Sequence, residues 1–246
     1  MENNARMFED KVVLVTGTSR GIGSNIAQHF LEQGAKVIGI SRTKNDSIDH
    51  ELFEPMCVDV TSEVDVNELV MFILEKHKKI DVLVNNAGIN KDSSLLKMEV
   101  EVFKDVIDVN LLGTFIMTKS VSKVMKEQKQ GKIVNLSSVA ARNNNYGQSN
   151  YAASKGAIEA FTRASAVEMA KNGINVNAVA PGCVKTNMFD HMDKTMIHSL
   201  ESKIPVRRFA LADEVSSVVL FLCSEGAQYI TGETVTVDGG LSISIM

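Results

Sequence analysis

The sequence has few of the residues that interrupt or cross-link a chain. Its 246 residues include only three prolines, three cysteines and no tryptophan. Because proline is scarce and no low-complexity tract or internal repeat is visible, we predict a single domain over 1–246. Cys57, Cys183 and Cys223 have neither the spacing of a disulfide framework nor that of a metal site. Such usage is typical of a reducing compartment, and we expect all three to be buried as small apolar side chains.

Dense positive charge and long apolar runs are also missing. The formal net charge is −4, with no block of Lys and Arg, which argues against binding of nucleic acid or of an anionic membrane. The longest apolar runs, 12–15 and 218–222, are far shorter than the roughly 20 residues of a membrane span. Residues 1–10 lack the charged start and apolar middle of a secretory signal. We therefore expect a cytosolic protein with a small, soluble partner.

The sequence does contain an alternation of short Val- and Ile-rich runs with longer segments of helical period. This alternation is typical of repeated βαβ units that build a parallel sheet. We predict strands at 12–16, 36–41, 56–60, 82–85, 132–137, 175–180 and 234–237, and helices at 23–33, 64–76, 101–127, 151–171 and 213–223. The expected fold class is α/β, with a single Rossmann-type, doubly wound sheet of seven parallel strands and helices on both faces.

The least regular stretch is 183–207, which follows Pro181 and Gly182 and has weak helical periodicity. Long irregular segments in compact domains are often lids over a site, so we predict a substrate lid here. The alternative is a short pair of surface helices with no gating role.

A glycine-rich segment, 16–23 (TGTSRGIG), joins the first predicted strand to the first predicted helix. Glycines at these points allow a tight turn, bring backbone N–H groups close to a pyrophosphate and direct a helix N-terminus at it. The position after the first strand of an α/β chain is the context that a dinucleotide site requires. A plain glycine-rich turn is the alternative.

Two arginines indicate which dinucleotide is preferred. After the second predicted strand, where an NAD site carries an acidic residue, this chain has Arg42. Arg42 and Arg20 are placed to bind a 2′-phosphate, which favours NADP(H), although either is alternatively an ordinary surface charge. Asp59 and Val60 end the third predicted strand, at the edge of the sheet where the adenine should lie.

Tyr151 and Lys155 are a candidate acid/base pair. Four residues apart in an Ala-rich segment of helical period, they share one face of the predicted helix. A neighbouring ammonium favours the phenolate, so we expect Lys155 to lower the Tyr151 pKa from its ordinary value near 10. Many solvated helices carry such a pair, so the spacing alone is weak evidence.

The chain resembles the short-chain dehydrogenase/reductases. The resemblance covers nearly the whole chain and rests on residues in the family's order and spacing: 16–23 (TGTSRGIG), 85–88 (NNAG), Asn110, Ser138, Tyr151, Lys155, Pro181 and Gly182. Within the family the chain is most similar to the β-ketoacyl carrier-protein reductases, including the segments 229–233 (YITGE) and 237–240 (VDGG).

The resemblance implies four catalytic residues. Tyr151 would protonate the substrate carbonyl as hydride arrives from the nicotinamide. Lys155 would lower the tyrosine pKa and hold the ribose hydroxyls, and Ser138, rather than its neighbour Ser137, would hydrogen-bond the substrate oxygen. Asn110 would hold a water that passes protons to Lys155, although a buried structural amide is the alternative.

The resemblance also implies the remaining contacts. The expected cofactor-binding residues are Gly17, Ser19, Arg20, Gly21, Ile22, Gly23, Arg42, Asp59, Val60, Asn86, Ala87, Gly88, Tyr151, Lys155, Pro181, Gly182, Val184 and Thr186. The expected substrate contacts are Ser138, Gln148 and Tyr151. For Pro181 and Gly182 the alternative is a rigid turn without ligand contact. A homotetramer is implied, with the helices at 101–127 and 151–171 packed against their symmetry mates.

The expected reaction is NADPH-dependent reduction of a β-ketoacyl thioester of an acyl-carrier protein or CoA. Lys123, Lys126, Lys129 and Lys132 would form a basic landing patch for an acidic carrier protein, or else a solvated face. Asn172 stands where carrier-protein reductases usually have further basic charge, which is a departure from their pattern.

Other functions stay open at this point. The polar segment 142–146 (RNNNY) suits a CoA thioester, a polyol or a cyclic ketone. Hydride transfer in the opposite direction, as in an alcohol dehydrogenase, is a further alternative. A non-catalytic dinucleotide sensor would not need all four catalytic residues together. The five histidines, including His191 and His198, lack the spacing of a metal site, so we predict no metal.

Overall fold

The computed structural model describes residues 6–43, 48–143, 146–185 and 193–244. Seven parallel strands form one sheet in the order β3-β2-β1-β4-β5-β6-β7. The strand order reverses between β1 and β4, so the sheet is doubly wound, as predicted. The strands are β1 (Val12–Thr16), β2 (Lys36–Ser41), β3 (Phe53–Cys57), β4 (Val82–Asn85), β5 (Gly131–Leu136), β6 (Ile174–Pro181) and β7 (Thr234–Val237).

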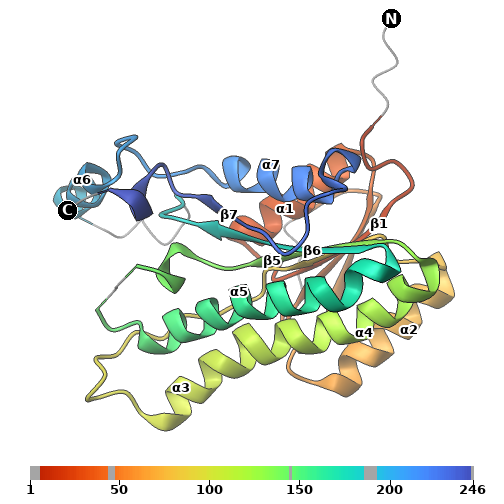
Figure 1. Cartoon of the computed structure of the whole chain (residues 1–246), viewed down its shortest axis with the longest axis horizontal. Helices are drawn as coiled ribbons and strands as arrows, with labels where there is room; N and C mark the ends of the chain where they lie inside the picture. The colour runs from red at the N-terminus through yellow and green to blue at the C-terminus, as the bar shows by residue number, and fades with distance from the viewer. Residues whose placement is uncertain (1–5, 44–47, 144–145, 186–192, 245–246) are drawn as a thin grey trace, which may run out of the picture.

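Helices cover both faces of the sheet (Figure 1). They are α1 (Gly21–Glu32), α2 (Glu63–His77), α3 (Val100–Ile107), α4 (Gly113–Gln128), α5 (Ser149–Met169), α6 (Lys194–Lys203) and α7 (Ala212–Cys223). In Figure 1, α1 and α7 lie above the sheet, and α2, α4 and α5 lie below it. β1 serves both layers, since Val13 and Val15 belong to the core under α1 and α7 while Val12 and Leu14 belong to the other core.

Three predicted elements differ from the structure. The third strand is Phe53–Cys57 and not 56–60, because it lies at the edge of the sheet, where Pro55 is tolerated. The helix predicted at 101–127 is interrupted by a π-helical turn, Asp108–Leu112, between α3 and α4. In the described part of the predicted lid, 183–185 and 193–207, the structure has the helix α6.

The cysteines do not all behave as predicted. Cys223 is buried, and burial raises its thiol pKa. Cys183 is only partly buried, and Cys57 is exposed at the end of β3, where its thiol contacts the Arg42 carbonyl oxygen. The prediction of three buried cysteines is therefore wrong for Cys57, because an edge strand is covered on one side only.

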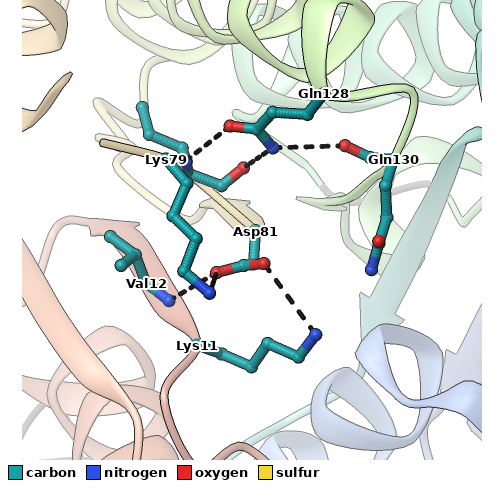
Figure 2. A network of polar contacts seen from close by, with 7 residues as sticks. Lys11, Val12, Lys79, Asp81, Gln128 and Gln130 are labelled. Carbon is teal, nitrogen blue, oxygen red and sulfur yellow. Dashed lines mark hydrogen bonds and ion pairs between the residues drawn. The ribbon is translucent and has the colours of Figure 1, made fainter. Parts of the chain in front are cut away.

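A polar network holds together the edge of the sheet at which β1 and β4 begin (Figure 2). The Asp81 carboxylate accepts a hydrogen bond from the Val12 amide at 2.8 Å and forms ion pairs with Lys79 at 3.1 Å and Lys11 at 3.9 Å. The Gln128 side chain bonds both backbone groups of Ile80, each at 2.9 Å. These contacts connect the C-terminal end of α4 to the residues just before β4, and those residues to the start of β1. No helix in the described part of the chain is long and apolar enough to cross a membrane.

Candidate active site

The predicted site residues come from segments that follow β1, β4, β5 and β6 and from the start of α5. Because the carboxyl ends of parallel strands lie at one edge of a sheet, these segments converge there. The glycine loop follows β1, Asn86 to Gly88 follow β4, and Ser138 follows β5. The structure thus places the predicted cofactor-binding residues and the predicted catalytic residues at the same edge of the sheet.

The glycine loop requires its glycines. Gly17 has φ +75° and Gly21 has φ +61°, conformations that side chains disfavour. A Cβ on Gly23 would overlap the Gly17 carbonyl oxygen and the Asn86 amide, so α1 begins tight against the loop. Helix α1 has no side chain capping its N-terminus and no acidic residue in its first turn. This arrangement suits the pyrophosphate of a dinucleotide, because first-turn N–H groups favour an anion there.

Thr16 and Asn86 fasten this loop to the end of β4. The Thr16 hydroxyl oxygen accepts hydrogen bonds from the backbone amides of Asn86 at 3.0 Å and Ala87 at 2.9 Å. In return, the Asn86 side chain donates to the carbonyl oxygens of Thr16 at 2.9 Å and Gly17 at 3.2 Å. The Asn86 side chain therefore fixes the backbone at the start of the glycine loop. Thr16 was not among the predicted site residues, although its place at the end of a strand before the first glycine was a usable signal.

The predicted 2′-phosphate residues lie at the surface. Ser19 and Arg20 are exposed in the glycine loop, and Arg42 is exposed after β2. Hydrogen bonds from the Thr61 amide and hydroxyl, at 2.9 and 2.8 Å, lower the Asp59 pKa, with a smaller contribution from Arg42. Asp59 and Val60 follow β3 rather than end it. The positive charge on this side of the glycine loop fits a phosphorylated ribose.

Tyr151 and Lys155 lie on one face of α5, as predicted, with the Lys155 Nζ 5.6 Å from the centre of the tyrosine ring. The Lys155 ammonium is buried and donates to the Leu136 carbonyl oxygen at 2.7 Å. Burial lowers the Lys155 pKa to about 8. Gly88 passes close to this ammonium, since a Cβ there would lie 3.7 Å from it.

The expected effect of Lys155 on Tyr151 is not seen. Burial raises the Tyr151 pKa, a contact with the Ser138 side chain lowers it, and the charge of Asp92 raises it. The prediction of a lowered phenol pKa is therefore wrong for the chain as described. The physical reason is that both groups lie away from water, so desolvation outweighs the attraction that the spacing suggested. The contact with Ser138 places a second hydroxyl beside the phenol, and the hydrogen bond from Ser138 to a substrate oxygen stays a prediction.

Asn110 lies in the π-helical turn and is fully buried. Its side-chain oxygen accepts from the Ile89 amide at 2.8 Å, and its side-chain nitrogen donates to the Ile89 carbonyl and to the Ser154 hydroxyl, both at 3.0 Å. The side chain thus joins the segment after β4 to α5, one residue before Lys155. This is the structural amide considered as the alternative, and the water relay stays a prediction. π-helical turns are often found at functional sites.

Pro181 ends β6, and Gly182 fits tightly behind it. A Cβ on Gly182 would lie 2.7 Å from the Asp238 Cβ, and the Gly182 amide donates to the Val237 carbonyl oxygen at 2.9 Å. Val184 is buried. These contacts are those of the rigid turn considered as the alternative, and contact with a nicotinamide stays a prediction. Thr186 and the predicted lid residues up to 192 lie outside the described residues.

A cavity of about 350 Å³ opens beside the predicted catalytic residues. Its lining is Leu95, Ala140, Ala141, Arg142, Asn143, Tyr146, Gly147, Gln148, Ser149 and Ala152. The lining includes the predicted substrate residue Gln148. It also includes Ala140, two residues after Ser138, and Ala152, the residue after Tyr151. Arg142, Asn143 and Tyr146 of the polar segment singled out in the sequence thus line this cavity.

Two other predictions concern surface side chains. Lys123, Lys126 and Lys129 are exposed, but Lys132 is buried on β5, and its Nζ donates to Asn175 at 2.7 Å. Burial lowers the Lys132 pKa. Lys132 therefore does not belong to a basic landing patch. His198 is exposed and pairs with Glu201 at 3.5 Å, whereas His191 lies outside the described residues.

A family model described as "Enoyl-(Acyl carrier protein) reductase" matches residues 17–242. A 3-oxoacyl-[acyl-carrier-protein] reductase of Thermotoga maritima is 41% identical and matches over 96% of this chain and 99% of its own. The chain belongs to the short-chain dehydrogenase/reductase family. It is an oxidoreductase of that family, and its nicotinamide-cofactor chemistry follows from the membership.

Other short-chain dehydrogenase/reductases resemble the chain with different named substrates. An acetoacetyl-CoA reductase of an Acinetobacter species is 38% identical, over 96% of this chain and 99% of its own. Among solved structures, the aldohexose dehydrogenase of Thermoplasma acidophilum has a TM-score of 0.91 and 33% identity, covering 98% of this chain and 97% of its own. A putative short-chain alcohol dehydrogenase from Sinorhizobium meliloti has a TM-score of 0.92 and 32% identity, covering 98% of this chain and 100% of its own.

Proposed function

We propose that the protein is an NADPH-dependent reductase that converts a β-ketoacyl thioester to the β-hydroxyacyl thioester. The observation that carries the proposal is the contact of Tyr151 with Ser138, one turn of helix from the buried Lys155 and next to the cavity. Relatives named for 3-oxoacyl-carrier-protein and acetoacetyl-CoA reduction support the substrate class.

Bound NADPH would supply the hydride. The Tyr151 phenol is protonated at neutral pH, since its ordinary pKa near 10 is raised further by burial, and it donates its proton to the carbonyl oxygen. The Ser138 hydroxyl donates a hydrogen bond to the same oxygen and stabilises the charge that develops on it. Lys155 would hold the ribose hydroxyls of the bound dinucleotide, and its positive charge favours the tyrosinate that remains.

The glycine loop and the N-terminus of α1 would hold the dinucleotide, and Arg20 and Arg42 would bind its 2′-phosphate. Pro181, Gly182 and Val184 would contact the nicotinamide, as would Thr186, which lies outside the described residues. For the acyl group, the CoA thioester is as well supported as the carrier-bound form, because the basic patch is reduced to Lys123, Lys126 and Lys129. We further propose a homotetramer formed through α4 and α5.

A polyol or sugar is the second candidate substrate. The wall of the cavity includes Arg142, Asn143 and Gln148, whose polar groups suit hydroxyls better than an acyl chain. The aldohexose dehydrogenase with the same fold is the comparison that favours it. Hydride would then flow from the substrate alcohol to the dinucleotide.

The first experiment follows NADPH absorbance with acetoacetyl-CoA and with an acetoacetyl-carrier thioester, and repeats both with NADH. We expect turnover with NADPH, and a loss of at least about 100-fold in kcat for Tyr151→Phe, since the proton donor is removed. NADPH binding by the variant, followed by nucleotide fluorescence, should stay within a factor of about 2. Turnover of aldohexose with NADP and of no thioester would instead establish the second candidate.

A further inference from the structure

One buried carboxylate connects the catalytic helix to the wall of the cavity. Glu159 lies on α5, two turns after Tyr151, and only 8% of its side chain is exposed. Its Oε2 accepts from the Arg142 Nε at 3.0 Å and pairs with the Arg142 Nη2 at 3.0 Å. Its Oε1 lies 3.2 Å from the Ser137 hydroxyl, which also lies 3.1 Å from the Lys155 carbonyl oxygen.

The two partners of Glu159 flank Ser138 in the sequence. Ser137 immediately precedes it, and Arg142 follows it by four residues. Between them, the amides of Ala141 and Arg142 donate to the carbonyl oxygens of Ser138 and Val139, both at 3.0 Å, and close a compact turn. The turn lies against α5, because a Cβ on Gly156 would lie 3.8 Å from the Ala141 carbonyl oxygen.

Because Glu159 is buried, its pairing with Arg142 is important for stability. An ionised carboxylate away from water is costly unless it is paired, so Glu159 requires the Arg142 guanidinium. The two nitrogens of Arg142 that face Glu159 fix the plane of the guanidinium. Half of the Arg142 side chain remains exposed, and the residue lines the cavity. The charge pair thus sets the position of the cavity wall relative to α5.

We propose that Glu159 is a positioning residue: through Ser137 it holds Ser138 in line with Tyr151, and through Arg142 it holds the substrate-facing wall of the cavity. The inference rests on the proposed reductase function of this site. Glu159 itself does not touch the reacting atoms. It acts on kcat through the Ser137 contact and on KM through the Arg142 contact.

The kinetic test separates the two contacts. Ser137→Ala should lower kcat roughly tenfold with little change in KM, because small displacements of a catalytic group are expensive. Arg142→Met leaves a buried carboxylate without its cation, so it is combined with Glu159→Gln. The double variant should raise the KM for acetoacetyl-CoA roughly tenfold and leave the affinity for NADPH unchanged. Glu159→Gln alone should show a milder rise in KM.

The matched control is Glu214→Gln, which also removes the charge from an arginine-paired carboxylate. Glu214 binds Arg208 at 2.7 Å through each oxygen, at the start of α7 on the other face of the sheet. We expect its KM and kcat to match the wild type. A purely structural role for Glu159 would lower the melting temperature and the active fraction without a change in KM.

A second readout does not depend on the substrate. The chain has no tryptophan, and Tyr146, in the cavity wall, is 90% exposed, so Tyr146→Trp introduces a single reporter. Its fluorescence anisotropy should fall when Glu159→Gln is added and should not change with Glu214→Gln. Unchanged anisotropy together with unchanged KM would overturn the inference. If the wild type reduces no thioester, the proposed function fails, whereas the anisotropy still decides the role of Glu159.

Discussion

Lys155, to which we assign a catalytic role in the proposed reaction, is a buried ammonium whose burial lowers the stability of the fold. Its pKa of about 8 lies below the ordinary value of 10.5. Between these values the unfolded chain binds more protons than the folded chain, so the contribution of Lys155 to stability rises with pH from about 8 to about 10.5. Below pH 8 the full penalty applies, on the order of 3 kcal/mol.

We therefore expect Lys155→Met to lose reductase activity and to gain stability at pH 7. Allowing for the lost bond to Leu136, the gain should be about 2 kcal/mol, or several degrees in melting temperature. The gain should shrink as the pH approaches 10, because the wild-type lysine is then neutral when folded. Melting curves of both proteins between pH 6 and 10 provide the measurement. A lower melting temperature for the variant at pH 7 would contradict this account.

At the scale of single residues, the sequence predicted which side chains share a helix face better than it predicted which side chains are buried. The shared face of Tyr151 and Lys155 followed from helical spacing and is confirmed. The direction of the Tyr151 pKa was wrong, and Lys132 was wrongly assigned to the surface. Both errors have one cause: burial depends on which elements pack together, and a periodicity pattern does not contain that information.

At the scale of elements, Thr16 joins β1 to the segment after β4, and its hydroxyl is the acceptor for two backbone amides. Thr16→Val keeps the shape and removes that acceptor. Partly buried amides without a partner cost about 1–3 kcal/mol each, so we expect a loss of about 2–3 kcal/mol in the free energy of unfolding. The affinity for NADPH should fall about tenfold because the glycine loop loses its anchor.

Thr16→Ser is the matched control, since it restores the hydroxyl and should recover most of both losses. Urea denaturation and nucleotide fluorescence measure the two quantities. Equal behaviour of the Val and Ser variants would show that the hydroxyl does not hold the loop.

Strongly patterned elements were predicted closely, and weakly patterned ones were not. The bounds of β1, β2 and β4 match the prediction because apolar runs inside the sheet leave no second register, and those of β7, at the edge opposite β3, match as well. The edge strand β3 was displaced, since a strand covered on one side has a weaker pattern. The π-helical turn at Asn110 inserts one residue into a helix whose apolar period continues across it, so only the three-dimensional contacts of the Asn110 side chain reveal it.

At the scale of the whole molecule, apolar side chains are exposed on α4, on the π-helical turn before it and on α5. Leu112 and Phe115 are 40% and 41% exposed, and Val167 is 82% exposed. The ring of Phe115 on α4 packs edge-on against the ring of Phe161 on α5, with 6.1 Å between the ring centres, so the two helices share one apolar surface. Such a surface is typical of an interface between subunits.

We expect Phe115→Glu to convert the proposed homotetramer into smaller species, because it places a charge at the centre of this surface. Light scattering coupled to size exclusion measures the change. Met71→Glu, at a 63% exposed position on α2, is the control and should leave the mass unchanged. A monomeric wild type, or a Phe115→Glu tetramer, would contradict the proposed assembly.

The network around Asp81 and Gln128 lies at the edge of the sheet where β1 and β4 begin, and the proposed catalytic residues lie at the edge where the strands end. A strand's length of apolar core separates them. The contacts that stabilise the sheet and the cavity proposed to bind the substrate therefore lie at opposite ends of the strands. Substitutions at Arg142, Asn143 or Gln148 in the cavity lining can therefore change the preferred substrate while the contacts that hold β1 and β4 together stay intact.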